Sequence, residues 1–141
     1  MAGKEAGVLY RWDIRLEKLI VYMVSSDLGA KAVKILLSPG RIEGRQWEKE
    51  FTGFTLLKGE EPNRPLMEAV LAVLEGGAPP RDLVLDIHPT PFQWGVWKTI
   101  QAIPFGSTAT YGEVARGLGK PAAARAVGRA MAQNPLPLIF P

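Results

Sequence analysis

The C-terminal stretch of residues 111–141 constrains the fold more than any other part of the sequence. It reads YGEVARGLGKPAAARAVGRAMAQNPLPLIFP. Thr110 and Glu113 fit the S/T-x-x-E capping box, which predicts a helix that begins at Tyr111. Gly119 is expected to end this helix, and the alanine-rich residues 122–132 predict a second one. Two short helices joined by a glycine-containing turn indicate a helix-turn-helix.

The second predicted helix carries few side chains that read bases. Recognition helices usually present Arg, Asn, Gln or Lys to base edges in the major groove. Small residues stand here instead, at Ala122, Ala123, Ala124, Ala126, Gly128 and Ala130. Such a surface permits close approach to a sugar-phosphate backbone, and Arg125 would project from it into the space of an extruded base. The alternative is that the alanines pack against another helix and Arg125 forms a surface ion pair.

Positive charge is concentrated in the same part of the chain. From Pro91 onward the only acid is Glu113, so this segment carries a net charge of +4, whereas the first ninety residues carry −1. The basic residues of the segment are Lys98, Arg116, Lys120, Arg125 and Arg129. A basic, nearly acid-free segment is typical of a surface that binds phosphates, although a solvated basic face is the alternative.

Composition excludes several classes of site. The sequence has no cysteine, so it offers no disulfide, no thiolate nucleophile and no cysteine-ligated zinc. His88 stands alone and is expected to be structural, and we predict neither a metal nor a cofactor. No apolar run approaches a membrane span, and the N-terminus lacks the apolar core of a signal peptide. We therefore expect a cytoplasmic protein without a membrane partner, and a monomer.

The N-terminal part predicts a small sheet with one helix. Residues 8–13 and 18–24 have the pattern of a β-hairpin, and residues 32–37 suggest a third strand. No element is assigned in the glycine-interrupted segment 41–61. Asn63 is expected to cap a helix that ends at Gly76-Gly77, and the alternation over residues 83–87 suggests a further short strand.

A proline-rich link separates this part from the next. Thr90 and Pro91 predict the start of a helix in which Trp94 and Trp97 share a face and pack in the core. We place the boundary in the link, which gives an N-terminal α/β domain at residues 1–88 and a C-terminal domain at residues 89–141. The predicted class is therefore α/β (α+β), with a sheet-plus-helix domain followed by a mostly helical one.

Across residues 90–141 the sequence resembles the C-terminal domain of the O6-alkylguanine-DNA alkyltransferases, or methylated-DNA–protein-cysteine methyltransferases. The matching pieces are TPFQWGVWKTIQAIPFGSTATYGEVA and AARAVGRAMAQNPLPLIFP, with their spacing intact. The resemblance implies a winged-helix/helix-turn-helix-like domain that binds the DNA minor groove and flips O6-alkylguanine out of double-stranded DNA. The N-terminal part is similar to the ribonuclease H-like domain of that family only in the order of its elements.

The resemblance also implies roles for individual residues. Arg125 would fill the space of the flipped base, while Tyr111 would crowd the target phosphate, line the pocket and donate a hydrogen bond to the departing guanine. Asn134 would support the turn before an active-site strand at residues 137–140. The remaining residues predicted to lie against DNA are Ala123, Ala124, Ala126, Gly128, Arg129 and Lys120.

In that family a Cys-His-Arg sequence directly follows the proline matched by Pro141, and this cysteine accepts the alkyl group irreversibly. The present sequence has no such residue and is expected to bind without transferring. Three interpretations are open: an incomplete alkyltransferase, a natural cysteine-less alkyltransferase-like protein that recognises damage, or a non-enzymatic DNA-binding module. The first is favoured by the apolar residues 138–140, which are expected to have few partners at the end of the chain.

Overall fold

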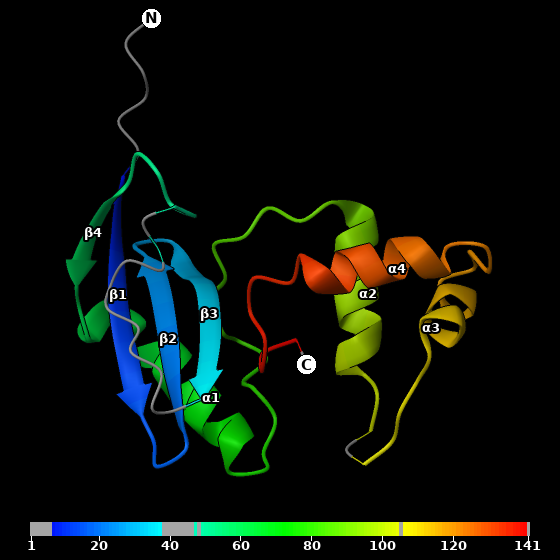
Figure 1. Ribbon diagram of the computed structural model, residues 1–141, viewed down its shortest axis with the longest axis horizontal. Coiled ribbons are helices and arrows are strands. Elements are labelled where there is room, and N and C mark those ends of the chain that lie inside the picture. Colours follow the sequence, from blue (N-terminus) through cyan, green and yellow to red (C-terminus); the bar gives the residue numbers. More distant parts are fainter. Residues whose placement is uncertain (1–6, 38–46, 48, 105, 141) are drawn as a thin grey trace, which may run out of the picture. The chain divides into compact units, whose positions relative to one another are not determined.

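The computed structural model describes residues 7–37, 47, 49–104 and 106–140. The chain divides into two compact units, Met1–Asp86 and Ile87–Pro141. The N-terminal unit contains a four-stranded sheet, and the described residues of the C-terminal unit form three α-helices (Figure 1). This mixture of a sheet unit and a helical unit confirms the predicted fold class. Among the described residues, no helix is long and apolar enough to span a membrane.

The sheet begins with the predicted hairpin. Strands β1 (Val8–Arg15) and β2 (Leu19–Ser26) pair antiparallel. Strand β3 (Gly29–Leu37) pairs with the other edge of β2, also antiparallel. The three predicted strands are thus confirmed, with ends that extend by up to three residues. Gly29 has a φ of +143°, so the turn into β3 uses a conformation that favours glycine.

A fourth strand lies where no element was predicted. Strand β4 (Thr55–Lys58) pairs parallel with β1, which gives the strand order β3-β2-β1-β4. It is only four residues long and largely exposed, so it lacks the buried alternation by which a strand is recognised in a sequence. Its pairing depends on the neighbouring strand β1 rather than on a local pattern.

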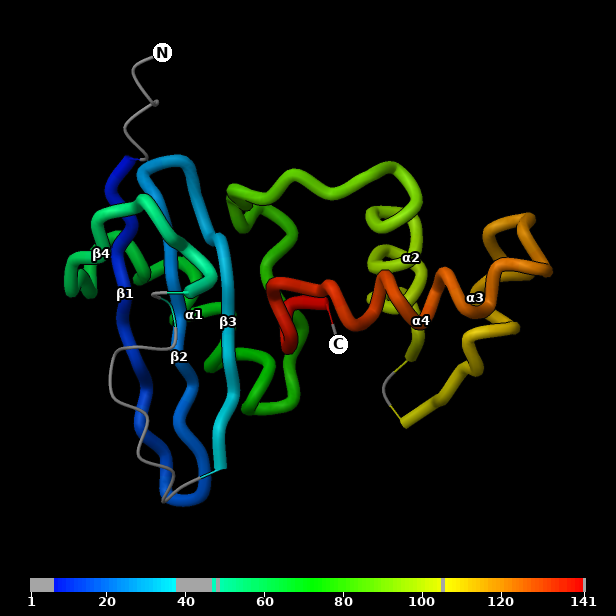
Figure 2. Tube along the Cα trace, turned by 45° about the horizontal axis from the view of Figure 1, so that its top comes forward, coloured from blue at the N-terminus to red at the C-terminus, as the bar shows by residue number. Residues whose placement is uncertain are grey.

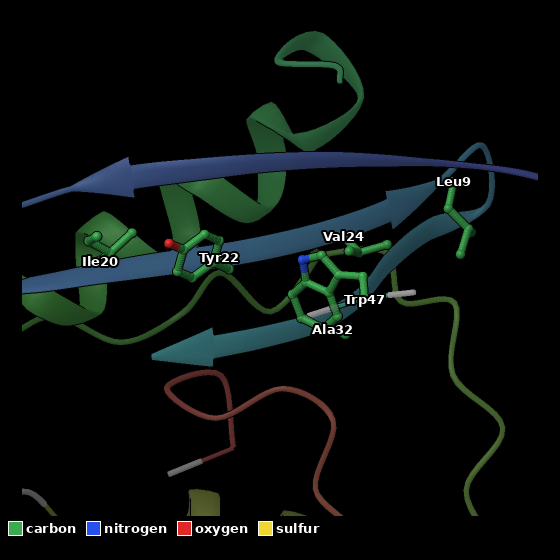
Figure 3. Close-up of a cluster of buried hydrophobic side chains, with 6 residues drawn as sticks. All are labelled: Leu9, Ile20, Tyr22, Val24, Ala32 and Trp47. Atoms are coloured by element: carbon green, nitrogen blue, oxygen red, sulfur yellow. The ribbon is translucent and has the colours of Figure 1, made fainter. Parts of the chain in front are cut away.

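Side chains of β2 alternate between the two faces of the sheet, as the pleat requires. On one face Tyr22 and Val24 join a buried cluster around the indole of Trp47, which Figure 3 shows close to Val24 and Ala32. The other members of this cluster are Leu9 and Ile20. Val21 and Met23 point to the opposite face, where Figure 1 places helix α1, and both are fully buried.

Helix α1 (Arg64–Leu74) follows a short 3₁₀ helix, η1 (Glu61–Asn63), and ends just before Gly76-Gly77 as predicted. The predicted capping role of Asn63 is wrong, because its side chain makes no cap hydrogen bond. It is instead fully buried and donates from Nδ2 to the carbonyl oxygens of Tyr10, at 3.0 Å, and Gly59, at 2.8 Å. The asparagine therefore ties β1 to the turn before the helix.

The strand predicted at residues 83–87 is also wrong. The segment makes a single bridge between Leu85 and Ala30, with hydrogen bonds from Ala30 N to Val84 O and from Asp86 N to Ala30 O. Val84 remains 64% exposed. The alternation predicted a strand, but a single bridge does not make a β-ladder with neighbouring residues.

The C-terminal unit consists of α2 (Pro91–Gln101), α3 (Tyr111–Gly117) and α4 (Ala124–Ala132). Helix α4 crosses α2 and also packs against α3, as both views show (Figures 1 and 2). The core of the unit is built from its three helices and the segment after α4. Its buried side chains are Val96, Trp97, Val114, Ala115, Val127, Ala130, Leu136, Ile139 and Phe140.

Candidate nucleic-acid interface

Helix α3 begins at the predicted capping box. The Glu113 N–H donates to Thr110 Oγ1 at 3.1 Å, and Glu113 Oε1 accepts from the Thr110 N–H at 3.5 Å. This pair satisfies backbone groups that a helix start otherwise leaves open, and it fixes Tyr111 as the first residue of the helix. The Tyr111 side chain is 52% exposed, and no hydrogen bond of its hydroxyl occurs among the described residues.

The turn between α3 and α4 follows the predicted pattern with one shift. Gly119 has a φ of +72°, as expected for the residue that ends a helix. Helix α4 begins at Ala124, two residues later than predicted, because the Ala123 N–H bonds to Lys120 O and closes a separate turn. The Lys120 ammonium lies 5.2 Å from the centre of the Phe92 ring, so this cation rests on α2.

One face of α4 is buried and the opposite face carries arginines. Val127 and Ala130 face the core, whereas Arg125 and Arg129 lie one turn apart on the exposed side. Neither arginine forms an ion pair among the described residues of the unit, so the alternative role of Arg125 as a surface ion-pair partner finds no support. The small residues Ala123, Ala124, Ala126 and Gly128 are all partly exposed.

The structure brings Tyr111 of α3 against Gly128 of α4. A Cβ atom built on Gly128 would lie 3.3 Å from Cε2 and 3.4 Å from Cδ2 of the tyrosine ring. Gly128 stands three residues after Arg125, so the two share a face of α4. Three residues that the sequence assigned separately to DNA thus occupy one surface, made by Tyr111, Gly128 and Arg125.

Asn134 holds the segment that follows α4. Its Oδ1 accepts from the Leu136 N–H at 2.9 Å, and its Nδ2 donates to the Phe140 carbonyl. The strand predicted at residues 137–140 is wrong, because these residues form a turn in which Leu138 has a φ of +77°. The turn closes on itself through a hydrogen bond from Phe140 N to Leu136 O, at 2.9 Å.

The expectation that apolar residues 138–140 have few partners is also wrong. Phe140 is only 2% exposed, and its ring centroid lies 5.8 Å from that of Trp97 in a stacked arrangement and 5.7 Å from that of Trp94 in a T-shaped one. Trp97 donates from Nε1 to Ala130 O at 2.8 Å, a carbonyl in the last turn of α4. Trp97 therefore packs in the core as predicted, but the same prediction is wrong for Trp94, whose ring contacts Phe140 and yet is 36% exposed. Sequence reasoning also missed Phe140 as the partner of both rings.

The positive charge of this unit is not neutralised by its single acid, because that acid is part of a helix cap. Glu113, the only acid after residue 90, is bonded to Thr110 in the capping box, where its Oε1 also accepts from the hydroxyl at 3.1 Å. Within residues 91–104 and 106–140, no lysine or arginine forms an ion pair. The unit can therefore present its positive charge to an anionic partner without first breaking a salt bridge.

The described residues contain no group of three or more histidine, cysteine, aspartate or glutamate side chains able to hold a metal. His88, expected to be structural, makes an interaction within the chain. The chemistry available at the surface is thus a phenol, guanidinium groups and an amide that fixes a turn.

Comparison with known proteins agrees with this geometry. Residues 91–141 match the family model described as the DNA-binding domain of 6-O-methylguanine DNA methyltransferase. The chain is 37% identical over 103 residues to a methylated-DNA–protein-cysteine methyltransferase of Mycolicibacterium paratuberculosis, a match that covers 72% of this chain and 60% of the relative. It is 39% identical over 85 residues to the Methanosarcina acetivorans protein of the same name, covering 60% and 54%.

Solved structures extend the likeness to nearly the whole chain. The crystal structure of O6-methylguanine methyltransferase of Mycobacterium tuberculosis superposes with a TM-score of 0.70 at 28% identity, covering 95% of this chain and 76% of that one. The structure of M. tuberculosis OGT in complex with DNA gives a TM-score of 0.68 at 28% identity, covering 94% and 75%. Capping box, helix-turn-helix and matched sequence together show that residues 91–141 belong to the family of the 6-O-methylguanine DNA methyltransferase DNA-binding domain, while the matches span from about a third to 60% of the length of the curated relatives.

Proposed function

We propose that this chain binds double-stranded DNA containing O6-alkylguanine, in the minor groove and through the surface of α3 and α4. The observation that carries the proposal is the combined placement of Tyr111, Gly128 and Arg125 on one exposed surface of a basic unit. An unpaired guanidinium on a row of small residues suits insertion into a base stack, because small neighbours allow close approach. Lys120 and Arg129 would contact phosphates, and Ala123, Ala124 and Ala126 would lie along the backbone.

Tyr111 and Arg125 have complementary roles in this proposal. Arg125 occupies the space that the guanine leaves as it rotates out of the stack, which offsets part of the cost of unstacking. The Tyr111 hydroxyl, without an internal hydrogen bond among the described residues, is free to donate to the flipped base. Asn134 keeps the turn at residues 136–140 in place after α4 through its two hydrogen bonds.

In the complete alkyltransferase reaction, a cysteine thiolate attacks the alkyl carbon, and the C–O6 bond breaks as the S–C bond forms. The electron pair and a proton go to guanine, for which a phenol such as Tyr111 is a suitable donor. None of the 141 residues is a cysteine, so this step requires a thiol that these residues do not supply. A second candidate that these residues also fit is a damage-recognition protein that binds the lesion without repairing it. In either case we propose a cytoplasmic monomer that associates with DNA.

A fluorescence titration tests the proposal with two hairpin duplexes that differ only in a central guanine or O6-methylguanine. The chain should bind both and prefer the lesion. Arg125→Ala should reduce the preference more than it reduces binding to undamaged DNA, whereas Arg116→Ala, which removes an arginine from α3, should weaken both equally. Equal losses for Arg125→Ala on the two duplexes would show that Arg125 does not fill the space of a flipped base.

A further inference from the structure

Gly128 stands in the middle of α4, where a glycine is unfavourable. A glycine in a helix interior costs about 1 kcal/mol relative to alanine, because it loses more backbone freedom on folding. Half of the other residues of the helix are alanines, and the φ of Gly128 does not require glycine. The reason for a glycine at this position must therefore lie in what surrounds it.

What surrounds Gly128 is the ring of Tyr111. An added Cβ would lie 3.3 Å and 3.4 Å from two ring carbons, which is tighter than ordinary van der Waals contact, so the ring would have to move by a few tenths of an ångström. Gly117, in α3, differs in this respect, because nothing lies within 4 Å of the Cβ that it lacks. Gly128 and Gly117 both lie in helices, but only at Gly128 would an added Cβ meet the Tyr111 ring.

We propose that Gly128 is a positioning residue that seats the Tyr111 ring against α4. The inference rests on the proposed function, and it changes the role of Gly128 from a point of DNA contact to a platform for the tyrosine. The ring is half exposed and has no hydrogen bond of its own among the described residues, so the contact with Gly128 determines where its hydroxyl lies. Because Arg125 shares this face of α4, the absent Cβ also fixes the tyrosine relative to the arginine.

The consequence is a distinction between stability and recognition. Gly128→Ala should leave the melting temperature unchanged or raise it, because alanine favours the helix. It should nevertheless displace the Tyr111 ring, and groups in a binding site must be held within about 0.5 Å of their productive positions. We expect the preference for O6-methylguanine to fall about threefold or more. Gly117→Ala, at the last residue of α3, should change stability little and keep the full preference.

The experiment compares the whole chain and its Gly128→Ala, Gly117→Ala, Tyr111→Ala and Tyr111→Ala/Gly128→Ala variants on the two duplexes described above. Support requires that Gly128→Ala lowers the preference alone but has no further effect when Tyr111 is already alanine. Ring signals of ¹³C-labelled tyrosine, with that of Tyr111 assigned from Tyr111→Phe, should move in Gly128→Ala and stay in Gly117→Ala.

Each of the following results would overturn the inference. A Gly128→Ala protein that keeps the wild-type preference shows that the platform is not needed. An equal effect of Gly128→Ala with and without the tyrosine shows that residue 128 acts on DNA directly. A wild-type chain that does not prefer the lesion contradicts the proposed function as well. The wild-type measurement therefore distinguishes failure of the proposed function from failure of the Gly128 inference alone. If Gly128→Ala does not fold, recovery of folding in the double variant supports the contact and no recovery contradicts it.

Discussion

The two units of this protein use their charged residues in opposite ways. In the N-terminal unit several lysines and arginines are paired: Lys34 Nζ lies 2.7 Å from Glu50 Oε2, and Lys31 Nζ lies 3.6 Å from the largely buried Asp86. Arg15 pairs with Asp13, and Arg64 pairs with Glu61. In the described part of the C-terminal unit the basic residues have no acidic partner, and the single acid serves a helix cap. The sheet unit therefore neutralises part of its charge internally, whereas the described basic residues of the helical unit are not neutralised by an ion pair.

The units also differ in how their interiors are fixed. The sheet unit buries an apolar cluster around Trp47 on one face and pairs its backbone along four strands. The helical unit has only short helices, and a Trp97 hydrogen bond and the Phe140 ring join α2 to α4 and to the following turn. Short helices gain most of their stability from packing. A few aromatic contacts should therefore contribute more to the stability of the helical unit than any single residue of its exposed face.

The largest expected effect is loss of this aromatic junction. Trp97→Ala removes the stack on Phe140 and leaves the Ala130 carbonyl without its indole donor, and large-to-small changes of this kind cost about 3–5 kcal/mol. Trp94→Ala is the matched control, because Trp94 is 36% exposed and has no such hydrogen bond among the described residues. Urea unfolding should show a much smaller loss for the control, and equal losses would contradict a central role for Trp97.

The next effect tests the difference in charge directly. Arg129→Gln should weaken binding to undamaged duplex DNA about three- to tenfold near 0.1 M salt and lower the slope of log K against log salt by about 1. Lys34→Gln removes the same charge from the sheet unit, where it is paired with Glu50, and should change neither quantity. Fluorescence anisotropy across a salt series provides both measurements. Comparable losses in the two variants would mean that DNA contacts both units.

A smaller effect concerns the one acid of the helical unit. Glu113→Gln should keep the cap of α3, because α2 of the same unit already uses Gln93 in an equivalent box with Thr90. Removal of the negative charge should raise DNA affinity about two- to threefold at low salt. Thr110→Ala instead loses the cap and should lower stability by about 1 kcal/mol. Reduced DNA affinity in a folded Glu113→Gln protein would show that the carboxylate contributes to the site itself.

Features with local causes could be predicted from the sequence. The boxes at Thr90 and Thr110 involve residues three apart, so helix starts were located to the residue, and the left-handed Gly119 marked the end of α3. The surface assigned to Arg125 and Tyr111 followed partly from helical spacing and partly from the resemblance to alkyltransferases. The individual roles of these residues stay predictions.

Features with distant causes could not be predicted. Leu138 has a positive φ in a turn whose last residue, Phe140, is bonded to Asn134 and stacked on Trp97, whereas an apolar run by itself suggests a strand. Asn63 has the residue type of a cap but is buried beneath Tyr10, and β4 forms only because β1 lies beside it. The contact of Gly128 with Tyr111 joins two helices, whereas the sequence suggested only that a small residue was needed there.

The smallest expected effect lies in the sheet unit and depends on pH. The hydrogen bond from Arg64, together with its positive charge, lowers the pKa of the Glu61 carboxyl from its ordinary value. A group whose pKa is lower in the folded state adds stability above its unfolded pKa and loses it as the pH falls through the folded one. Both side chains are exposed, so the contribution is small. Arg64→Gln should flatten the fall of melting temperature below about pH 4.5. Arg81→Gln removes an exposed arginine without an ion pair among the described residues and should leave the pH profile of the melting temperature unchanged. An unchanged profile for Arg64→Gln would show that the pair of Arg64 and Glu61 contributes nothing measurable to stability.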